Sequence, residues 1–253
     1  MLTTKERCNS VSKANKQYKN QMAAAEHKRD VQVRIILTAV LVIFALAVGF
    51  FVIQGRDGSA DAAAPRSVTD SGAIRAVSPD VELTEGSETP KRVLTIFEDF
   101  QCPVCKSFEA AFGGILDELR TSGVAAIDYH PIAILDRMSS TNYSTRAANA
   151  SVCVADSSVD TWLTFHSSAY AQQPAEGGEG LSDAALGDIA TAAGAPDSVR
   201  GCIEDGQHED WVTSSTQSVL DRDINATPTV LLNGEALDLT TPEALSAAVR
   251  AIP

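Results

Sequence analysis

Basic side chains are scarce over most of this sequence. Residues 56–253 contain twelve Lys and Arg against thirty Asp and Glu, a net charge of −18. A surface of this sign repels phosphate, which argues against a nucleic-acid-binding protein. Residues 1–34 have the opposite balance, with eight basic and three acidic side chains. The hydrophobic content of 44% is high enough for a folded core, so we do not expect disorder throughout the chain.

Charged side chains are absent from residues 35–55, and apolar ones fill most of this stretch. The run from Ile35 to Ile53 would form about 28 Å of helix, close to the thickness of the hydrocarbon core of a bilayer. A buried core helix rarely runs this long without a polar face. A cleavable signal peptide normally has a shorter apolar core and a shorter basic region. We therefore expect an uncleaved transmembrane helix over residues 35–54.

The charges on either side of this segment predict its orientation. The basic residues 1–34 should form a cytoplasmic tail, which places the C-terminal part of the chain outside the cytoplasm. Residues 55–73 are rich in Gly, Ala, Ser and Asp and lack aromatic side chains, a composition typical of a flexible linker. Residues 74–253 are long enough for one domain. We expect a single-pass protein of the cell membrane with an extracytoplasmic domain.

Cysteine is also rare, with five residues in the chain. Cys8 lies on the side expected to be cytoplasmic and reducing, so we predict a free thiol there. The other four lie outside, and an even number is typical of a disulfide-bonded exported domain. Cys102 and Cys105 are too close in sequence to staple a fold, which leaves Cys153 and Cys202 as the natural structural pair. The alternative is that Cys153 and Cys202 are buried thiols that act as small hydrophobic side chains.

The motif Cys102-Pro103-Val104-Cys105 lies between a strand-like run over residues 92–97 and a predicted helix. Pro suits the first turn of a helix, where a missing N–H costs nothing. The unpaired N–H groups and the dipole of this helix start would stabilise a thiolate at Cys102, the form that attacks disulfides. Apolar residues then recur with helical spacing, at Val104, Phe108, Ala111, Phe112, Ile115 and Leu119.

This placement predicts a redox pair. Cys102 should react with substrates, and Cys105, one helical turn later, should resolve the mixed disulfide. Val104 offers no charge to the thiolate, as a His at this position would. We therefore expect the pKa of Cys102 to lie below that of a free Cys but above that of the strongest oxidants.

Two other interpretations of the motif remain open. A C-x-x-C pair can be half of a zinc site, but His130, His166 and His208 are scattered and neither remaining Cys has a Cys or His neighbour. The pair could also be an inert local disulfide. We expect no metal site and no cofactor. His166 follows Phe165 on a helical face, which is more typical of a core or surface residue than of a catalytic one.

The end of the chain contains the second half of the predicted domain. Residues 230–232 and 235–239 flank Asn233-Gly234, a strong hairpin signal. Thr241 and Pro242 are typical of the start of a final helix. Residues 124–129 predict a further strand, which Pro131 would end. The order is therefore strand, helix and strand, followed by strand, strand and helix. Between these halves, residues 139–223 show helical patterns, with Ser182 as a helix cap.

On these residues, the chain over about 74–253 resembles the DsbA-like thiol–disulfide oxidoreductases of the thioredoxin fold. The matching segments are FEDFQCPVC at 97–105 and ATPTVLLNG at 226–234, together with the helical insert. The resemblance implies an α/β fold in which a βαβ unit and a ββα unit enclose the insert, here preceded by one transmembrane helix. It also implies membrane-anchored relatives in Gram-positive and actinobacterial envelopes.

The resemblance implies further site residues. Thr227-Pro228 should have a cis peptide bond and face the Cys pair, with the backbone of Thr227 pairing with an extended substrate segment. From the sequence alone, a trans bond at a strand start would be the ordinary expectation. Some family members also hold an acidic residue under the active site to move protons. Glu98 and Asp99 are the candidates, and strand alternation would turn only one of them inward.

Together these patterns favour an extracytoplasmic oxidase of cysteine pairs in exported proteins. A substrate thiolate would attack Cys102 of the disulfide, and the second substrate thiol would resolve the mixed disulfide. The resemblance implies reoxidation by a quinone-linked membrane enzyme of the VKOR or DsbB type. Two alternatives stay open: a reductase or isomerase with the same fold, because direction depends on the reduction potential, and a binding module whose Cys pair is idle.

Overall fold

The computed structural model describes residues 64–237 and 241–253. The basic tail, Cys8 and the predicted transmembrane helix at 35–54 lie outside the described residues. No helix within the described part is both long and apolar enough to cross a bilayer.

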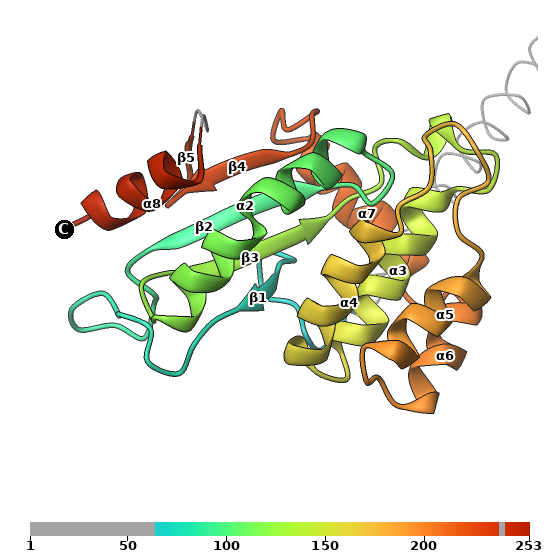
Figure 1. The fold of residues 1–253 in the computed structure, drawn as a ribbon, viewed down its shortest axis with the longest axis horizontal. Helices are drawn as coiled ribbons and strands as arrows, with labels where there is room; N and C mark the ends of the chain where they lie inside the picture. The colour runs from blue at the N-terminus through green and yellow to red at the C-terminus, as the bar shows by residue number, and fades with distance from the viewer. Residues whose placement is uncertain (1–63, 238–240) are drawn as a thin grey trace, which may run out of the picture. The chain divides into compact units, whose positions relative to one another are not determined.

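The described residues contain a mixed sheet of five strands in the order β1-β3-β2-β4-β5 (Figure 1). β2 and β3 are parallel, and the other neighbours are antiparallel. The parallel pair is joined through helix α2, and the hairpin β4–β5 is followed by α8. The strands are β1 (Ile74–Ala76), β2 (Val93–Glu98), β3 (Ala126–Pro131), β4 (Thr229–Leu232) and β5 (Glu235–Ala236).

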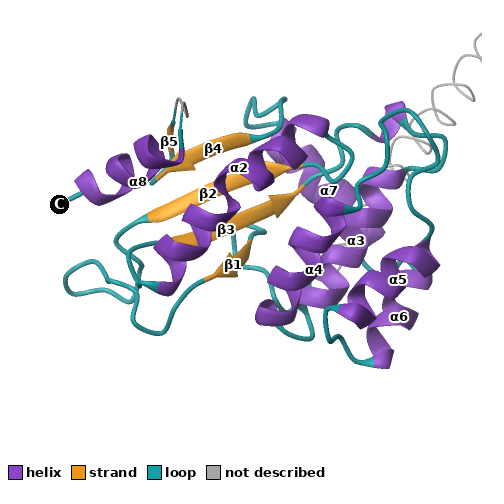
Figure 2. Ribbon diagram, viewed as in Figure 1, coloured by secondary structure: helices purple, strands orange, loops and turns teal. Residues whose placement is uncertain are grey.

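Helices enclose the sheet and form the insert. Figure 2 shows the insert helices grouped beside the end of the sheet toward which β3 runs. α2 (Pro103–Thr121) and α8 (Pro242–Ala251) belong to the sheet-containing part. The insert contains the short helix η1 (Asp136–Met138), α3 (Tyr143–Ala155), α4 (Val159–Ala171), α5 (Asp183–Ala192), α6 (Asp197–Glu204) and α7 (Glu209–Leu220).

Alternation along β2 places apolar side chains on both faces of the sheet. Leu94 and Ile96 join the main core with α2, and neither is exposed. Phe97 points the other way and packs with Ile132 and Val219 in a second cluster. Because both faces of β2 are covered, the strand is fixed at the centre of the fold, and its carboxyl end leads directly into the Cys102–Cys105 segment.

The predicted order of elements is confirmed, with two differences. The strand predicted at 124–129 is β3, and it continues through Pro131. β1 pairs with β3 at the sheet edge and was not predicted from the sequence. Residues at the end of the predicted linker also contact the domain, since the Ser67 amide donates to Asp156 Oδ1 at 2.8 Å.

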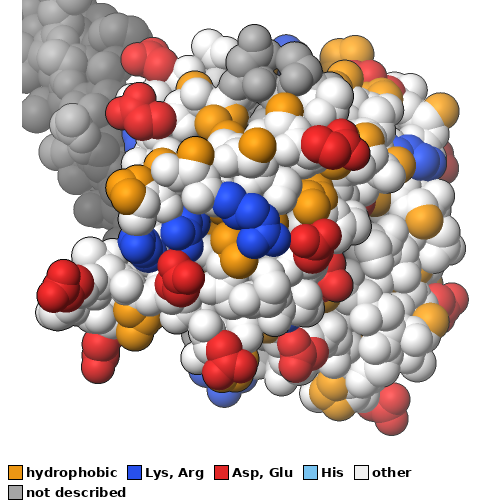
Figure 3. Space-filling model, turned by 60° about the vertical axis from the view of Figure 1, so that its left-hand side comes forward, with side chains coloured by type: hydrophobic (Ala, Val, Ile, Leu, Met, Phe, Trp, Pro, Cys, Tyr) orange, Lys and Arg blue, Asp and Glu red, His pale blue; other side chains and the backbone are white. Residues whose placement is uncertain are grey.

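Acidic side chains are dispersed over the face of the described residues that Figure 3 draws. On the face shown in Figure 3, Asp and Glu side chains lie apart from one another, and hydrophobic side chains occur between them. On this face, the arrangement is that of an ordinary solvated surface.

Candidate active site

Helix α2 begins directly at the Cys pair. Cys102 is its N-cap residue and Pro103 occupies the first turn, as the motif predicts. The Cys102 amide donates to the Asp99 carbonyl at 2.9 Å, which folds the end of β2 back onto the helix start. Both cysteines are free thiols with little exposure, 6% for Cys102 and 1% for Cys105. Val104 between them is 60% exposed, so this turn of the helix reaches the surface.

The pKa values of the two thiols are shifted in opposite directions. A hydrogen bond from Cys105 is the largest cause that lowers the pKa of Cys102, and contacts with Thr227 and with backbone amides add to it. These outweigh burial and bring the pKa of Cys102 to about 5. The same hydrogen bond, together with burial, raises the pKa of Cys105 far above its ordinary value. Cys102 is therefore a thiolate at neutral pH, and Cys105 keeps its proton.

Thr227 and Pro228 face the Cys pair, and the peptide bond between them is cis, as the resemblance implies. The Cys102 thiol lies 3.4 Å from the Thr227 carbonyl oxygen. Beside them is a pocket of about 450 Å³. Its lining is largely apolar and consists of Val104, Ser107, Phe108, Phe112, Thr227, Pro228, Val230 and Leu237.

Glu98 and Asp99 are both buried, with exposures of 3% and 0%, so the expectation that only one of them points inward is wrong. β2 ends at Glu98, and alternation does not extend to Asp99. The Asp99 carboxylate accepts the amides of Gln101 at 2.8 Å and Leu135 at 2.9 Å. Burial outweighs these bonds and raises the pKa of Asp99 to about 6.

Glu98 contacts His166 of α4. The sequence predicted no contact between these two residues. Glu98 Oε1 lies 2.7 Å from His166 Nε2, and Glu109 Oε1 lies 3.8 Å from His166 Nδ1. His166 is buried at 2% exposure, in agreement with the expectation of a core or surface residue. Burial lowers the pKa of its imidazole, but Glu98 and Glu109 outweigh burial and raise it on balance. The signal for Glu109 was present, because this carboxylate follows Cys105 by four residues on the packed face of the predicted helix.

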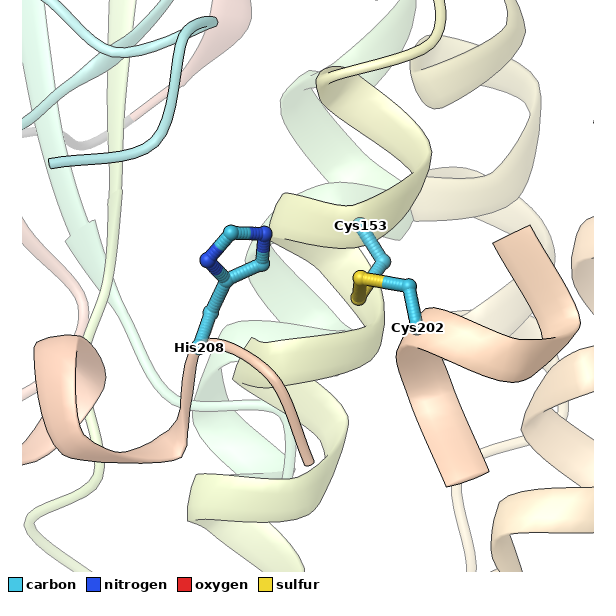
Figure 4. Close-up of side chains that lie close together, drawn as sticks. All are labelled: Cys153, Cys202 and His208. Atoms are coloured by element: carbon cyan, nitrogen blue, oxygen red, sulfur yellow. A yellow bond between two sulfur atoms is a disulfide. The ribbon is translucent and has the colours of Figure 1, made fainter. Parts of the chain in front are cut away.

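Cys153 and Cys202 form a disulfide that joins α3 to α6 (Figure 4). The pair predicted from the cysteine count is therefore confirmed, and the alternative of two buried thiols is wrong. His208, just before α7, lies beside the disulfide, with its ring nitrogen within 4.8 Å of the sulfur atoms. The disulfide lies on α3 and α6, whereas the Cys102–Cys105 pair lies at the start of α2. The structural disulfide and the redox pair are therefore on separate elements.

Comparison with known proteins agrees with this geometry. The model of a family described as Thioredoxin matches residues 79–251. The fold is similar to that of reduced DsbA from Mycobacterium tuberculosis, with a TM-score of 0.66, 37% identity and coverage of 71% of this chain and 91% of that one. It is also similar to the disulfide oxidoreductase DsbG of the same organism, with a TM-score of 0.67, 37% identity and coverage of 71% and 86%.

More distant similarity shows the fold alone. MdbA from Corynebacterium diphtheriae, a thiol-disulfide oxidoreductase, has a TM-score of 0.60 at 18% identity, with coverage of 74% of this chain and 92% of that one. The serine/threonine-protein kinase PknE of Mycobacterium tuberculosis is 33% identical over 126 residues, which are 48% of this chain. The chain spans only about a fifth of that kinase, 22% of its length. From the matched residues and the site, the chain belongs to the thioredoxin family and, within it, to the DsbA-like thiol–disulfide oxidoreductases.

Proposed function

We propose that this protein is an extracytoplasmic oxidase that introduces disulfides into exported proteins through Cys102 and Cys105. The observation that carries the proposal is the acidity of Cys102, whose pKa is about 5. A stabilised thiolate favours the reduced form of the pair, and the disulfide form is then a strong acceptor of electrons. This property favours oxidation over the reductase and isomerase alternatives.

The reaction runs in two exchanges. A substrate thiolate attacks Cys102 Sγ, the Cys102–Cys105 bond breaks, and its electron pair leaves with Cys105. A second substrate thiolate then attacks the substrate sulfur of the mixed disulfide, and Cys102 leaves as the thiolate. The substrate gains a disulfide, and the enzyme pair is reduced by two electrons.

The surroundings of Cys102 support an extended polypeptide as substrate. The apolar pocket lies beside the exposed turn at Val104, and the half-buried backbone of Thr227 adjoins Cys102. We propose that Thr227 and Pro228 bind substrate by pairing of backbone groups, while the pocket accepts an apolar side chain next to the reacting cysteine.

The carboxyl groups divide into two roles in this proposal. The Asp99 carboxylate accepts the backbone amides of Gln101 and Leu135, one at each oxygen. Glu98 is close enough for its charge to contribute to the raised pKa of Cys105. We therefore propose Glu98 as the group that exchanges protons with Cys105, and Asp99 as a support for the loop that leads into α2.

The localisation and the reoxidation partner belong to the same proposal. The uncharged segment at 35–54 would anchor the domain outside the cytoplasm, where a disulfide such as Cys153–Cys202 persists. A quinone-linked reoxidase of the VKOR or DsbB type in the same membrane would restore the oxidised pair.

The catalytic role is tested by oxidative refolding of a reduced, unfolded protein with the oxidised full chain. Cys102→Ser should abolish the acceleration of refolding, and Cys8→Ser, which changes a thiol outside the domain, should leave it intact. Full activity in the Cys102→Ser variant would identify an idle pair and a binding module.

A further inference from the structure

Three titratable side chains meet beneath the active-site helix. His166 of α4 lies between Glu98 at the end of β2 and Glu109 of α2, and its two ring nitrogens face different carboxylates. The side chains of His166, Glu98 and Glu109 are only 2%, 4% and 18% exposed. An imidazole placed in this way can accept a proton at one nitrogen and release one from the other.

Aromatic rings close the cluster on the remaining sides. The His166 ring centroid lies 4.8 Å from the ring of Trp162, 5.0 Å from Tyr129 and 5.1 Å from Tyr170. Burial lowers the pKa of His166, but the two carboxylates outweigh it and the pKa is raised on balance. Burial raises the pKa of Glu109. The charged and titratable groups that face His166 are thus Glu98 and Glu109, with the hydroxyls of Tyr129 and Tyr170 neutral near pH 7 because burial raises their pKa well above 10.

Cys105 lies at one end of this cluster. Glu109 follows Cys105 by four residues, so their side chains share one face of α2. The negative charge of Glu98 contributes to the raised pKa of Cys105, which places Glu98 within electrostatic reach of the thiol. Glu109 therefore places the cluster on the same face of α2 as the sulfur atom that must gain or lose a proton in each catalytic cycle.

At the other end of the cluster, α2 and α4 pack against each other, and residues of both helices line a cavity. Its volume is about 310 Å³, and Glu109, His166, Tyr129 and Arg120 are among its lining residues. It shares no lining residue with the pocket beside Thr227, because the two use different faces of α2. Gly113 makes room for the carboxylate here: a Cβ at this position would lie 2.8 Å from Glu109 Oε1.

We propose that Glu98, His166 and Glu109 form a proton-transfer chain between Cys105 and this cavity. Protons then reach the buried thiol from the side of α2 away from the substrate, which can cover the Cys102 surface without blocking them. His166 is a positioning residue that acts through the two carboxylates. This inference rests on disulfide exchange at Cys102 and Cys105, the proposed function.

The chain acts when the Cys102–Cys105 bond breaks. The electron pair of that bond stays on Cys105 Sγ, which takes one proton from Glu98. Glu98 recovers the proton from His166 Nε2, and His166 recovers one at Nδ1 from Glu109, which is reprotonated from water in the cavity. In the reverse direction Cys105 gives up its proton along the same groups before it attacks the mixed disulfide. No oxidant or reductant other than the substrate is needed.

The test is the rate at which a dithiol peptide reduces the oxidised full chain, measured by acid quench and mass spectrometry between pH 5 and pH 9. His166→Gln keeps a polar side chain next to Glu98 but cannot relay a proton. We expect it to slow reduction at pH 7 by at least about tenfold, the lower range for loss of an acid–base group, and to change the shape of the pH profile. The matched control is His208→Gln, since His208 also faces a carboxylate, Asp156, at 3.5 Å but lies beside the Cys153–Cys202 disulfide.

A second variant, Gly113→Ala, distinguishes loss of proton transfer from a purely structural effect of His166→Gln. Gly113→Ala should displace the Glu109 carboxylate and slow the same step with His166 in place. Added imidazole, a size that the cavity admits, should restore the rate of His166→Ala but not that of Cys102→Ser. Rates within twofold of the wild type in both His166→Gln and Gly113→Ala would overturn the proton chain, as would slow variants with an unchanged pH profile and no response to imidazole.

These outcomes separate the inference from the proposed function. If Cys102→Ser abolishes exchange while His166→Gln and Gly113→Ala leave it unchanged, the function stands and the proton chain fails. If Cys102→Ser retains exchange, the proposed function itself fails.

Discussion

At the scale of single residues, the site depends on the difference between two cysteines one helical turn apart. Both are buried, but Cys102 accepts the hydrogen bond and Cys105 donates it. The N-terminus of α2 adds backbone amides on the side of Cys102 only. Cys102 is therefore the reactive thiolate, and Cys105 remains a protonated thiol.

This difference predicts how the reduced protein reacts with iodoacetamide. Because only the thiolate reacts, alkylation of Cys102 should rise with pH and reach half its maximal rate at about pH 5, the pKa of this thiol. Cys105 should remain unmodified through neutral pH. Peptide mapping of the alkylated protein measures both, and a midpoint near that of a free Cys, about 8.5, would contradict the assigned environment.

The sequence predicted the cysteines and named Glu98 and Asp99 as candidate carboxyls, but it did not predict the contact of Glu98 with His166. The spacing of Cys102 and Cys105 at a helix start involves four consecutive residues, so the sequence alone can predict it. The contact of Glu98 with His166 spans 68 residues, and no periodicity of either segment indicates it. The incorrect assignment of one inward carboxyl has the same origin, since the end of β2 is set by the turn that brings Asp99 back to Cys102.

At the scale of elements, the insert is held by a staple between two helices. The Cys153–Cys202 disulfide joins α3 and α6 across 49 residues of sequence, with 5.9 Å between the two Cα atoms. The loop it closes contains α4 and α5, which supply His166 and pack against α3. The staple thus restricts the segment that contains α4, the helix that packs against α2 and supplies His166.

Removal of this disulfide should cost stability and leave the chemistry in place. A Cys153→Ala/Cys202→Ala variant should lose about 4 kcal/mol in the free energy of unfolding, because the unfolded chain regains the entropy of a loop of this length. Urea unfolding of both proteins, read together with the refolding activity of Cys102, makes the measurement. A loss below about 1 kcal/mol, or abolished exchange in a folded variant, would contradict the division between staple and redox pair.

The sequence predicts helix starts more reliably than it predicts the strand at the edge of the sheet. Thr241 caps α8 and Ser182 caps α5 through side-chain oxygens, both as expected from the sequence. The cap is a contact within four residues, so the sequence contains it. β1 has three residues and exists through its pairing with β3, more than 50 residues later, which no local pattern shows.

At the scale of the whole molecule, charge divides the chain into regions. The segment without charge separates a basic tail of 34 residues from the acidic remainder. This partition could be read from the sequence, as could the order of strands and helices in the domain. The relation between the insert and the sheet could not, because it depends on tertiary contacts such as those of α2 with α4.

The proposed topology predicts the outcome of protease treatment. In spheroplasts, protease added from outside should remove a C-terminal tag after Pro253 and leave an N-terminal tag before Met1 intact, because the positive-inside rule places residues 1–34 in the cytoplasm. Lysed cells provide the control in which both tags are lost. A C-terminal tag that survives in spheroplasts would contradict an extracytoplasmic domain.

The central claim is that the acidic Cys102 thiolate makes this protein an oxidant, and the reduction potential of the Cys102–Cys105 pair tests it most directly. Equilibration of the purified full chain with glutathione buffers, followed by thiol trapping and mass spectrometry of the Cys102 peptide, gives this potential. We expect a value more oxidising than about −200 mV, as the stabilised thiolate requires. A potential at or below about −270 mV, the value of thioredoxin, would contradict the account and identify a reductase.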